Sequence, residues 1–321
     1  MISIEKSLSS GLNPTSFESE WLYHKNASEW WGFTGQATDE NHNLYGIQFK
    51  LIKTNFLCFK PFILVLAFTN LTTNKQYYYQ KRIKNKNKII INNNYVGIRD
   101  MAYIEKFNHG YNLFFKTKNF GAELFLSPNK PPVWHCDKGI LKLGETDKTN
   151  FFYSFTNLSV HGLLTNQKEM INVNGKGWLD KQGGNFKLTD GKTHWESFAL
   201  SFEDGEEIKL FSFPQKDVKD GTYIDKLGNY TRLENFVITP TKFKKIEKLK
   251  FACEWELSLP KIKEQKYKIK IILEKNSNLP YEKSLAKIIN EKEEEVGVCF
   301  VELLPGARNK KFKMKLFSKH K

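Results

Sequence analysis

Carboxylates beside tryptophans are the residues of this sequence whose types and spacing could do chemistry. Asp180 follows Trp178 by two positions, and Glu29 directly precedes Trp30 and Trp31. Because side chains two apart on a strand point to the same side, the ring of Trp178 and the carboxyl of Asp180 would share one cavity. A carboxylic acid among apolar side chains has a raised pKa, since burial disfavours its charged form. Such an acid is able to donate a proton near neutral pH, and an indole face stabilises a cation.

Each of these residues also has a structural interpretation. Asp180 could accept hydrogen bonds from backbone amides at a turn between two domains, and Glu29 could anchor a loop. Trp30 and Trp31 are adjacent and so face opposite sides of a strand, which means that at most one points into a given cavity. Tryptophan is also common in β cores for its packing alone. The residues alone leave both interpretations open.

Other common catalytic and metal-binding patterns are absent from the sequence. Its seven histidines and four cysteines never stand at the paired spacing of metal ligands, and no nucleophile elbow or glycine-rich phosphate loop occurs. We therefore expect no metal and no cofactor. The widely separated cysteines are expected to be free thiols in a reducing compartment.

The net charge of +15 favours an anionic partner, but the kind of basic residue weighs against nucleic acid. Of 50 basic residues only four are arginine, whereas proteins that read nucleic acid rely on arginine for bidentate contacts. We expect no nucleic-acid partner, and peripheral membrane contact through the lysine-rich surface remains an alternative. The N-terminus lacks the pattern of a signal peptide, and the most apolar run, 62–68, is too short for a membrane span of about 20 residues. These features predict a cytoplasmic protein and leave its oligomeric state open.

Strands must position the candidate residues, because strand patterns dominate the sequence. Short runs rich in aromatic and β-branched residues are separated by turn residues such as Asp204-Gly205. Several runs alternate polar and apolar residues, which puts one face of the strand in solvent and the other in a core. With 321 residues we expect two domains, each an antiparallel barrel or sandwich. The expected strands are 45–52, 62–68, 76–80, 112–115, 122–127, 151–164, 195–202, 207–213, 248–259, 266–273, 296–304 and 312–317.

Three segments are less clear. Residues 279–292 have helix propensity, and their periodicity alone leaves helix and strand open. The Asn- and Lys-rich segment 81–94 is expected to be an exposed hairpin connection. The basic C-terminus from Arg308 predicts a last strand with lysines on its outer face, with an electrostatic tail as the alternative.

Two motifs are specific enough to compare with a known family. The first is E-W-W-G-F-T-G at 29–35, followed by Y-G-I-Q-F at 45–49, and the second is V-N-G-K-G-W-L-D-K-Q at 173–182. Together they resemble the AttH-like, carotenoid-hydratase-like (hydroxyneurosporene synthase-like) family of tandem lipocalin-type proteins. The motifs of that family read E-W-W-Y-x-x-G-x-L, Y-G-x-Q-F and G-x-A-W-x-D-x-E-W. Further similarities follow in order, so that the resemblance spans about residues 20–306.

The resemblance implies an all-β fold of two consecutive antiparallel lipocalin-like (calycin) β-barrels. The first would comprise residues 1–188 and the second residues 189–321, with the second motif near their junction. The family places a hairpin across the unclear segment. A strand at 279–291 followed by a turn at 292–295 is therefore implied, against the local helix propensity.

The resemblance also implies a chemistry. The family includes hydratases that add water across isoprenoid double bonds, and related folds host cyclases. In the hydratases an aspartate at the W-x-D position is the acid, which implies that Asp180 is the catalytic proton donor here. The implied ligand-binding residues are Trp178, Trp30, Trp31, Tyr153, Glu29 and Gln182, whose aromatic members would stabilise a carbocation.

Two departures from the hydratase pattern weigh against carotenoid hydration itself. An upstream His-x-Trp pair is replaced by aromatic residues at 151–153, and the second carboxylate of the motif is replaced by Gln182. Lys181 would lower the pKa of Asp180 if the two side chains faced one another. We expect either a cofactor-independent hydratase or cyclase acting on an elongated isoprenoid, polyene or polyketide-like molecule, or a non-catalytic carrier of such a ligand.

Overall fold

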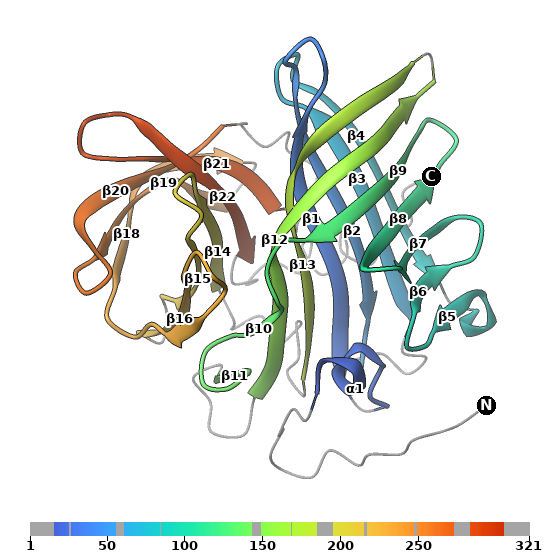
Figure 1. Ribbon diagram of the computed structural model, residues 1–321, viewed down its shortest axis with the longest axis horizontal. Coiled ribbons are helices and arrows are strands. Elements are labelled where there is room, and N and C mark those ends of the chain that lie inside the picture. Colours follow the sequence, from blue (N-terminus) through green and yellow to red (C-terminus); the bar gives the residue numbers. More distant parts are fainter. Residues whose placement is uncertain are drawn as a thin grey trace. The chain divides into compact units, whose positions relative to one another are not determined.

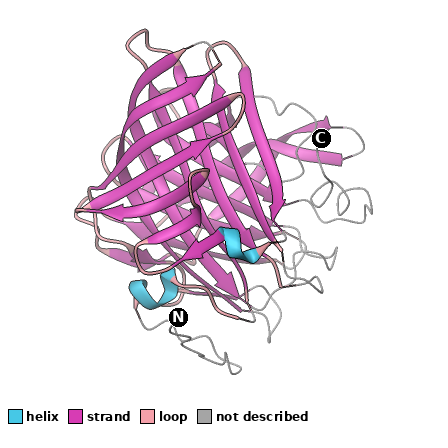
Figure 2. Cartoon of the chain, turned by 90° about the vertical axis from the view of Figure 1, so that its right-hand side faces the viewer, coloured by secondary structure: helices cyan, strands magenta, loops and turns pink. Residues whose placement is uncertain are grey.

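The structure, a computed structural model, describes residues 16–25, 27–55, 61–83, 85–142, 149–167, 169–184, 195–214, 217–246, 249–272 and 283–304. Antiparallel strands make up nearly all of its regular structure (Figure 1, Figure 2). The chain divides into two compact units. Within the described residues the first unit runs to Trp134 and resumes at Lys138, and the second contains His135–Asp137 and the chain from 195 onward. The boundary expected at 188 and 189 falls outside the described residues.

The first unit is one curled antiparallel sheet. Its strands follow the order β4-β3-β2-β1-β13-β12-β9-β8-β7-β6-β5, and β10 and β11 pair with β12. Among the described residues no ladder joins β4 to β5, so the sheet is a half-barrel. Its elements are α1 (Phe17–Trp21), β1 (Ser28–Thr38), β2 (Leu44–Lys53), β3 (Phe62–Asn70), β4 (Lys75–Ile83), the 3₁₀ turn η1 (Lys86–Lys88), β5 (Ile89–Ile91), β6 (Tyr95–Ile98), β7 (Ala102–Phe107), β8 (Gly110–Lys116), β9 (Phe120–Pro128), β10 (Val133–Trp134), β11 (Ile140–Lys142), β12 (Thr149–Asn166) and β13 (Met170–Gly184).

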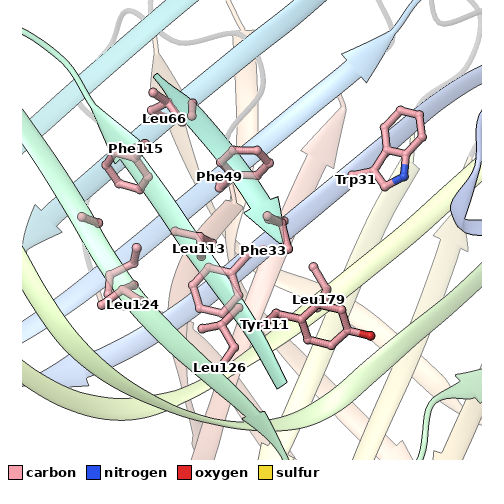
Figure 3. Packing of buried hydrophobic residues seen from close by; sticks show 14 of the residues in the cluster. Trp31, Phe33, Phe49, Leu66, Tyr111, Leu113, Phe115, Leu124, Leu126 and Leu179 are labelled. Carbon is pink, nitrogen blue, oxygen red and sulfur yellow. The ribbon is translucent and has the colours of Figure 1, made fainter. Parts of the chain in front are cut away.

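One apolar core fills the concave side of this sheet, which we call the inner face (Figure 3). Side chains at alternate positions supply it, as the two-residue period of a strand requires. Trp31 and Phe33 come from β1, Phe49 from β2 and Leu179 from β13, and they pack with residues of β8 and β9 such as Leu113.

The strands nearest the centre of the sheet are buried on both faces. The run 28–35 in β1 and the run 177–184 in β13 are buried at nearly every position. In contrast, β8 alternates between buried and more exposed positions. The outer sides of β1, β2, β12 and β13 therefore hold a second buried surface, away from the inner core.

The second unit is a nine-stranded antiparallel sheet in the order β17-β16-β15-β14-β22-β21-β20-β19-β18. Its own apolar core surrounds Trp255, whose indole N–H donates to Glu196 Oε2 at 3.1 Å. Its strands are β14 (Trp195–Phe202), β15 (Glu207–Phe213), β16 (Val218–Ile224), β17 (Tyr230–Arg232), β18 (Val237–Ile246), β19 (Leu249–Leu259), β20 (Lys263–Ile271), β21 (Lys283–Ile289) and β22 (Glu295–Leu304).

The predicted all-β fold of two consecutive antiparallel, lipocalin-like units is confirmed. The described part of the unclear segment 279–292 contains strand β21, and a turn leads from it to β22, so strand context overrides helix propensity there. The expectation for 81–94 was wrong in part, because this segment contains the end of β4, η1 and β5. The predicted strand at 312–317 lies outside the described residues.

Some strands were not predicted, for reasons that their sequences show. Strand β18 lies at the edge of its sheet and contains Pro240, at a shift of register opposite β19. Proline in a sheet is confined to such edges and bulges. Strands β6 and β7 are short and are joined by a tight turn at Arg99 and Asp100, which interrupts their apolar pattern.

The described residues contain neither a membrane-spanning helix nor a cluster suited to a metal ion. The α-helix α1 is only five residues long, and no helix in this part of the chain is long and apolar enough to cross a bilayer. No group of three or more His, Cys, Asp or Glu side chains in the same residues is arranged to hold a metal.

Candidate functional site

Four neighbouring strands of the first unit carry a buried polar surface on their outer side, which we call the Asp180 face. Strand β13 contributes Trp178, Asp180 and Gln182, which alternate with Leu179 and Lys181 of the inner face. The strand register arranges the face in three rows across β2, β1, β13 and β12. The first row is Gln48, Thr34, Trp178 and Thr156, the last of which lies at the bulge of β12. The second row is Lys50, Gly32, Asp180 and Ser154. The third row is Ile52, Trp30, Gln182 and Phe152. All twelve residues are buried.

Asp180 lies inside a strand, four residues before the end of β13, rather than in a turn. Its exposure is only 3%. The hydroxyl of Ser154, its direct neighbour on β12, donates to Asp180 Oδ1 at 2.6 Å. The carboxyl group is therefore held in a defined orientation on the sheet.

Lys50 is a member of this face that was not predicted. It lies in the same row as Asp180, with only Gly32 between them. Its Cγ is 3.5 Å from the position that a Cβ on Gly32 would occupy, so its stem leans over the glycine. With strands about 4.8 Å apart, the Cα atoms of Lys50 and Asp180 are roughly 10 Å apart. The signal in the sequence was the polar pair Gln48 and Lys50 at a spacing of two within an otherwise apolar strand.

Unpaired polar atoms cluster in the row beside Asp180. Thr34 Oγ1, Gln48 Nε2 and Thr156 Oγ1 are buried and have no hydrogen-bond partner among the described residues. Leaving such a group unpaired costs about 1–3 kcal/mol. Buried polar groups normally have partners, so a row of exceptions marks a place where a bound molecule could supply them.

The structure does not bring all the predicted site residues together. Trp178, Trp30 and Gln182 share the face of Asp180, as the two-residue period predicts. Trp31 and Tyr153 belong to the inner core instead. The indole of Trp31 donates to the carbonyl of Trp21 at 2.8 Å, and the hydroxyl of Tyr153 donates to the carbonyl of Phe17 at 3.1 Å. These two residues attach the segment around α1 to the sheet.

Glu29 also faces inward, where it forms the centre of a buried ionic cluster. Lys181 Nζ donates to Glu29 Oε1 at 2.8 Å, and the backbone N–H of His24 donates to Oε2 at 2.7 Å. His24 Nδ1 lies 2.9 Å from Oε1, and Lys53 Nζ lies 3.5 Å from Oε2. Burial alone would raise the pKa of the Glu29 carboxyl, but these neighbours together hold it below its ordinary value of 4.5.

This cluster also determines where Lys181 points. Its ammonium pairs with Glu29 and lies 3.9 Å from the ring centre of Trp31, on the inner side of the sheet. Asp180, the preceding residue, points to the outer side. The two side chains do not face one another, so the condition under which Lys181 would lower the pKa of Asp180 is not met.

A family model described as AttH-like matches residues 10–297, which is most of the chain. The chain belongs to the AttH-like family. The resemblance inferred from the two motifs is thereby confirmed. No curated protein shows significant similarity to this AttH-like chain.

Several solved structures share the fold of this family member. An AttH candidate from Nitrosomonas europaea is 17% identical, covers 92% of this chain and 98% of its own, and gives a TM-score of 0.79. The kievitone hydratase of Nectria haematococca is 14% identical, covers 87% of this chain and 89% of its own, and gives a TM-score of 0.69. CghA bound to Sch210972 is 10% identical, covers 92% of this chain and 93% of its own, and gives a TM-score of 0.53. At such low identity these similarities show the fold alone.

Proposed function

We propose that this AttH-like protein is a cofactor-independent hydratase or cyclase that acts on an elongated hydrophobic molecule, with Asp180 as the proton donor. One observation carries the proposal: a buried carboxyl group oriented by Ser154 shares its face with an indole and with unpaired polar atoms. Apolar area with a few well-placed polar groups is typical of small-molecule sites. Trp178 is the proposed cation-stabilising residue, and Trp30 and Gln182 are the proposed ligand contacts.

The chemistry needs only one acid–base group. The protonated carboxyl of Asp180 transfers its proton to one carbon of a double bond, so that a C–H bond forms, the π bond breaks and a carbocation remains on the other carbon. The Trp178 ring stabilises this cation by about 1–2 kcal/mol in a desolvated site. In hydration, the oxygen of water bonds to the cation and its proton returns to the carboxylate. In cyclisation, the π electrons of a second double bond form a C–C bond to the cation, and the new cation loses a proton from a neighbouring carbon to the carboxylate, which gives the cyclic alkene.

The surroundings of Asp180 suit a group that is alternately acid and base. Burial favours the neutral form of a carboxyl group, whereas the hydrogen bond that Ser154 donates to Asp180 favours the carboxylate. Both forms occur in the proposed cycle, first as donor and then as acceptor. A group balanced between them is an efficient acid–base catalyst near neutral pH.

The variant Asp180→Asn tests this role, because it keeps the shape of the side chain and removes the acid. We expect product formation from farnesol, squalene or lycopene in isotope-labelled water, followed by mass spectrometry, to fall at least about 100-fold. Binding of the same compounds and the melting temperature should stay close to wild type. Asp100→Asn is the matched control, since Asp100 is exposed and has a left-handed backbone conformation that asparagine also adopts.

A carrier function is the second candidate, favoured by the hydrogen bond from Ser154, which already gives Asp180 a structural partner. If Asp180 only accepts hydrogen bonds, the amide would present weaker acceptors and cost about 1–3 kcal/mol of stability. The catalytic role would be excluded if the Asp180→Asn protein melts well below wild type but, at temperatures where it is folded, forms product at the wild-type rate. If none of the three compounds is converted by the wild type but they still bind, the carrier function is supported.

A further inference from the structure

A cavity lies at one end of the first unit, where three hairpin turns meet. It has a volume of about 520 Å³ and opens between the β1–β2, β3–β4 and β12–β13 turns. Its lining residues, which we call the hairpin pocket, are Asp39, Glu40, Asn41, Asn43, Tyr45, Phe68, Asn70, Thr73, Lys75, Tyr77, Asn166, Glu169, Met170, Ile171 and Asn172. A volume of this size is within the range of small-molecule sites, roughly 300–1,000 Å³.

The hairpin pocket is separate from the Asp180 face. Asn172 lines the pocket on β13, eight residues before Asp180 on the same strand. At about 3.3 Å per residue the two positions are roughly 26 Å apart along the strand. A molecule in the pocket would therefore not touch the proposed acid.

Aromatic rings form one wall of the pocket. Phe68 is buried, with its ring centre 4.6 Å from that of Tyr77 and 6.5 Å from that of Tyr45. Phe120 packs behind them, 5.6 Å from Phe68. These rings pack tilted or edge to face, and a wall of rings that is fixed by the core offers an apolar surface to a ligand.

Polar groups of the lining are fixed in place before any ligand arrives. Asp39 accepts hydrogen bonds from the backbone of Asn41 and Asn43, and from the Tyr45 hydroxyl at 2.9 Å. Burial and the bond to Asp39 raise the pKa of Tyr45 to about 12, so its hydroxyl stays protonated at neutral pH. Asn166 donates to Glu169 Oε2 at 3.0 Å across the neighbouring turn.

The composition of the lining indicates the class of ligand. Five asparagines line the pocket. Those at 43, 70 and 166 already bond to neighbouring residues of the lining, but each amide has two N–H donors and two acceptor lone pairs, so each keeps capacity to bond a hydroxyl group, which also donates and accepts. The carboxylates of Asp39, Glu40 and Glu169 against the one ammonium of Lys75 give the lining a charge of −2, although the whole chain carries +15. Such a lining repels anions and favours polyhydroxylated molecules that are neutral or carry an amine.

We propose that the hairpin pocket binds a carbohydrate of one or two rings, with the apolar face of a sugar ring against Tyr77 and its hydroxyl groups on the asparagines and carboxylates. An amine on the sugar is accepted at the carboxylates, and a phosphate is rejected. The site is independent of the chemistry at Asp180.

Calorimetric titration of the full chain with glucosamine, glucose and a phosphorylated glucose tests the proposal. We expect glucosamine to bind most tightly, glucose more weakly and the phosphorylated sugar not at all. Tyr77→Ala should weaken binding of both sugars by about tenfold or more, the scale of a lost aromatic anchor. Tyr79→Ala is the matched control, since Tyr79 lies two positions further on the same strand and does not line the pocket.

A second variant keeps the test valid if Tyr77→Ala does not fold. Glu169 is exposed, so Glu169→Gln should fold normally, and it should reduce the preference for glucosamine over glucose. Glu123 is an exposed carboxylate on β9 outside the pocket, so Glu123→Gln should leave this preference unchanged. Asp180→Asn should leave sugar binding unchanged. The proposal is overturned if neither sugar binds at millimolar concentration, if the phosphorylated sugar binds as well as glucosamine, or if neither pocket variant alters binding.

Discussion

At the scale of single residues, the ionic cluster around Glu29 shows how a charged side chain survives inside a β core. The carboxylate is fully buried and is surrounded by Lys181, Lys53 and the backbone N–H of His24. Removing one partner of a buried ion pair leaves the other charge uncompensated. The cluster should therefore matter for folding more than for ligand binding.

We expect Lys181→Met to cost about 3–5 kcal/mol of unfolding free energy, because Glu29 would lose its closest cation. In the double variant Glu29→Gln, Lys181→Met no buried carboxylate is left unpaired, so it should be more stable than Lys181→Met alone. Urea denaturation of both variants measures the coupling. Additive effects of the two changes would show that the pair does not act as a unit.

The same cluster gives the stability a pH dependence. Since the pKa of Glu29 is lowered in the folded state, its contribution is present above its ordinary value of 4.5 and is lost as the pH falls through the lower folded value. The wild type should thus lose stability in this acidic window. Glu29→Gln should lose less there, and an identical acid response in both proteins would contradict the assignment.

The sequence was sufficient to predict which residues share a face of a strand, but not whether that face is the inner or the outer side of the sheet. The period of two correctly separates Trp30 from Trp31 and joins Trp178 to Asp180. Which side each pair takes depends on strands that pair across long separations, as with Lys181 and Glu29, which are 152 positions apart. Lys181 points away from Asp180 because neighbours on a strand alternate, while Lys50 joins the row of Asp180 only through the pairing of β1 with β2 and β13.

At the scale of the strand, the glycines of the two motifs differ in what they allow. Gly35 and Gly177 are direct neighbours on β1 and β13, and a Cβ on either would lie 2.6 Å from the ring of Phe33. The missing side chains make room for this buried ring. Gly32 is different, because a Cβ there would meet only ordinary contacts with Lys50 and Phe49, at 3.5 and 3.7 Å.

Alanine substitutions should separate these cases. Gly177→Ala should destabilise the protein by about 1–3 kcal/mol, since the Phe33 ring must move in a close-packed core. Gly32→Ala should change stability by less than about 1 kcal/mol, because the strand gains a better β residue at no steric cost. Thermal melting of the two variants compares them directly, and equal losses would mean that Gly32 is also needed for packing.

Strand existence was predictable where the apolar pattern was regular, whereas the list of expected strands lacked the central strands β1 and β13, which are rich in glycine and polar residues, and the edge strand β18. Strands β2, β3 and β9 have buried runs that stand out against polar turns, so their positions were predicted to within a few residues. Strand β18 escaped because an edge strand with lysines and a proline lacks a core-facing pattern. The prediction of a strand at β21 depended on the family resemblance, since its local sequence also suits a helix.

At the scale of the whole molecule, each unit has an apolar core of its own. One centres on the inner face of the first sheet and the other on Trp255. The chain nevertheless passes between the units more than once, because His135–Asp137 belongs to the second unit while β10 and β11 on either side pair with β12. The backbone N–H of Cys136 donates to Thr222 Oγ1 at 2.8 Å within that unit. Cutting the chain between 184 and 195 would therefore remove part of the second unit, so stability is best tested in the full chain.

Two matched core substitutions test whether the cores unfold separately. Leu113 in the first core and Leu210 in the second are both fully buried, so Leu113→Ala and Leu210→Ala should each cost about 2–5 kcal/mol through lost contacts and a cavity. Because the two cores share no residue, we expect calorimetry to show two transitions, with each variant lowering a different one. A single transition that both variants lower equally would instead show that the molecule unfolds as one cooperative unit, with the segment His135–Asp137 linking the two units.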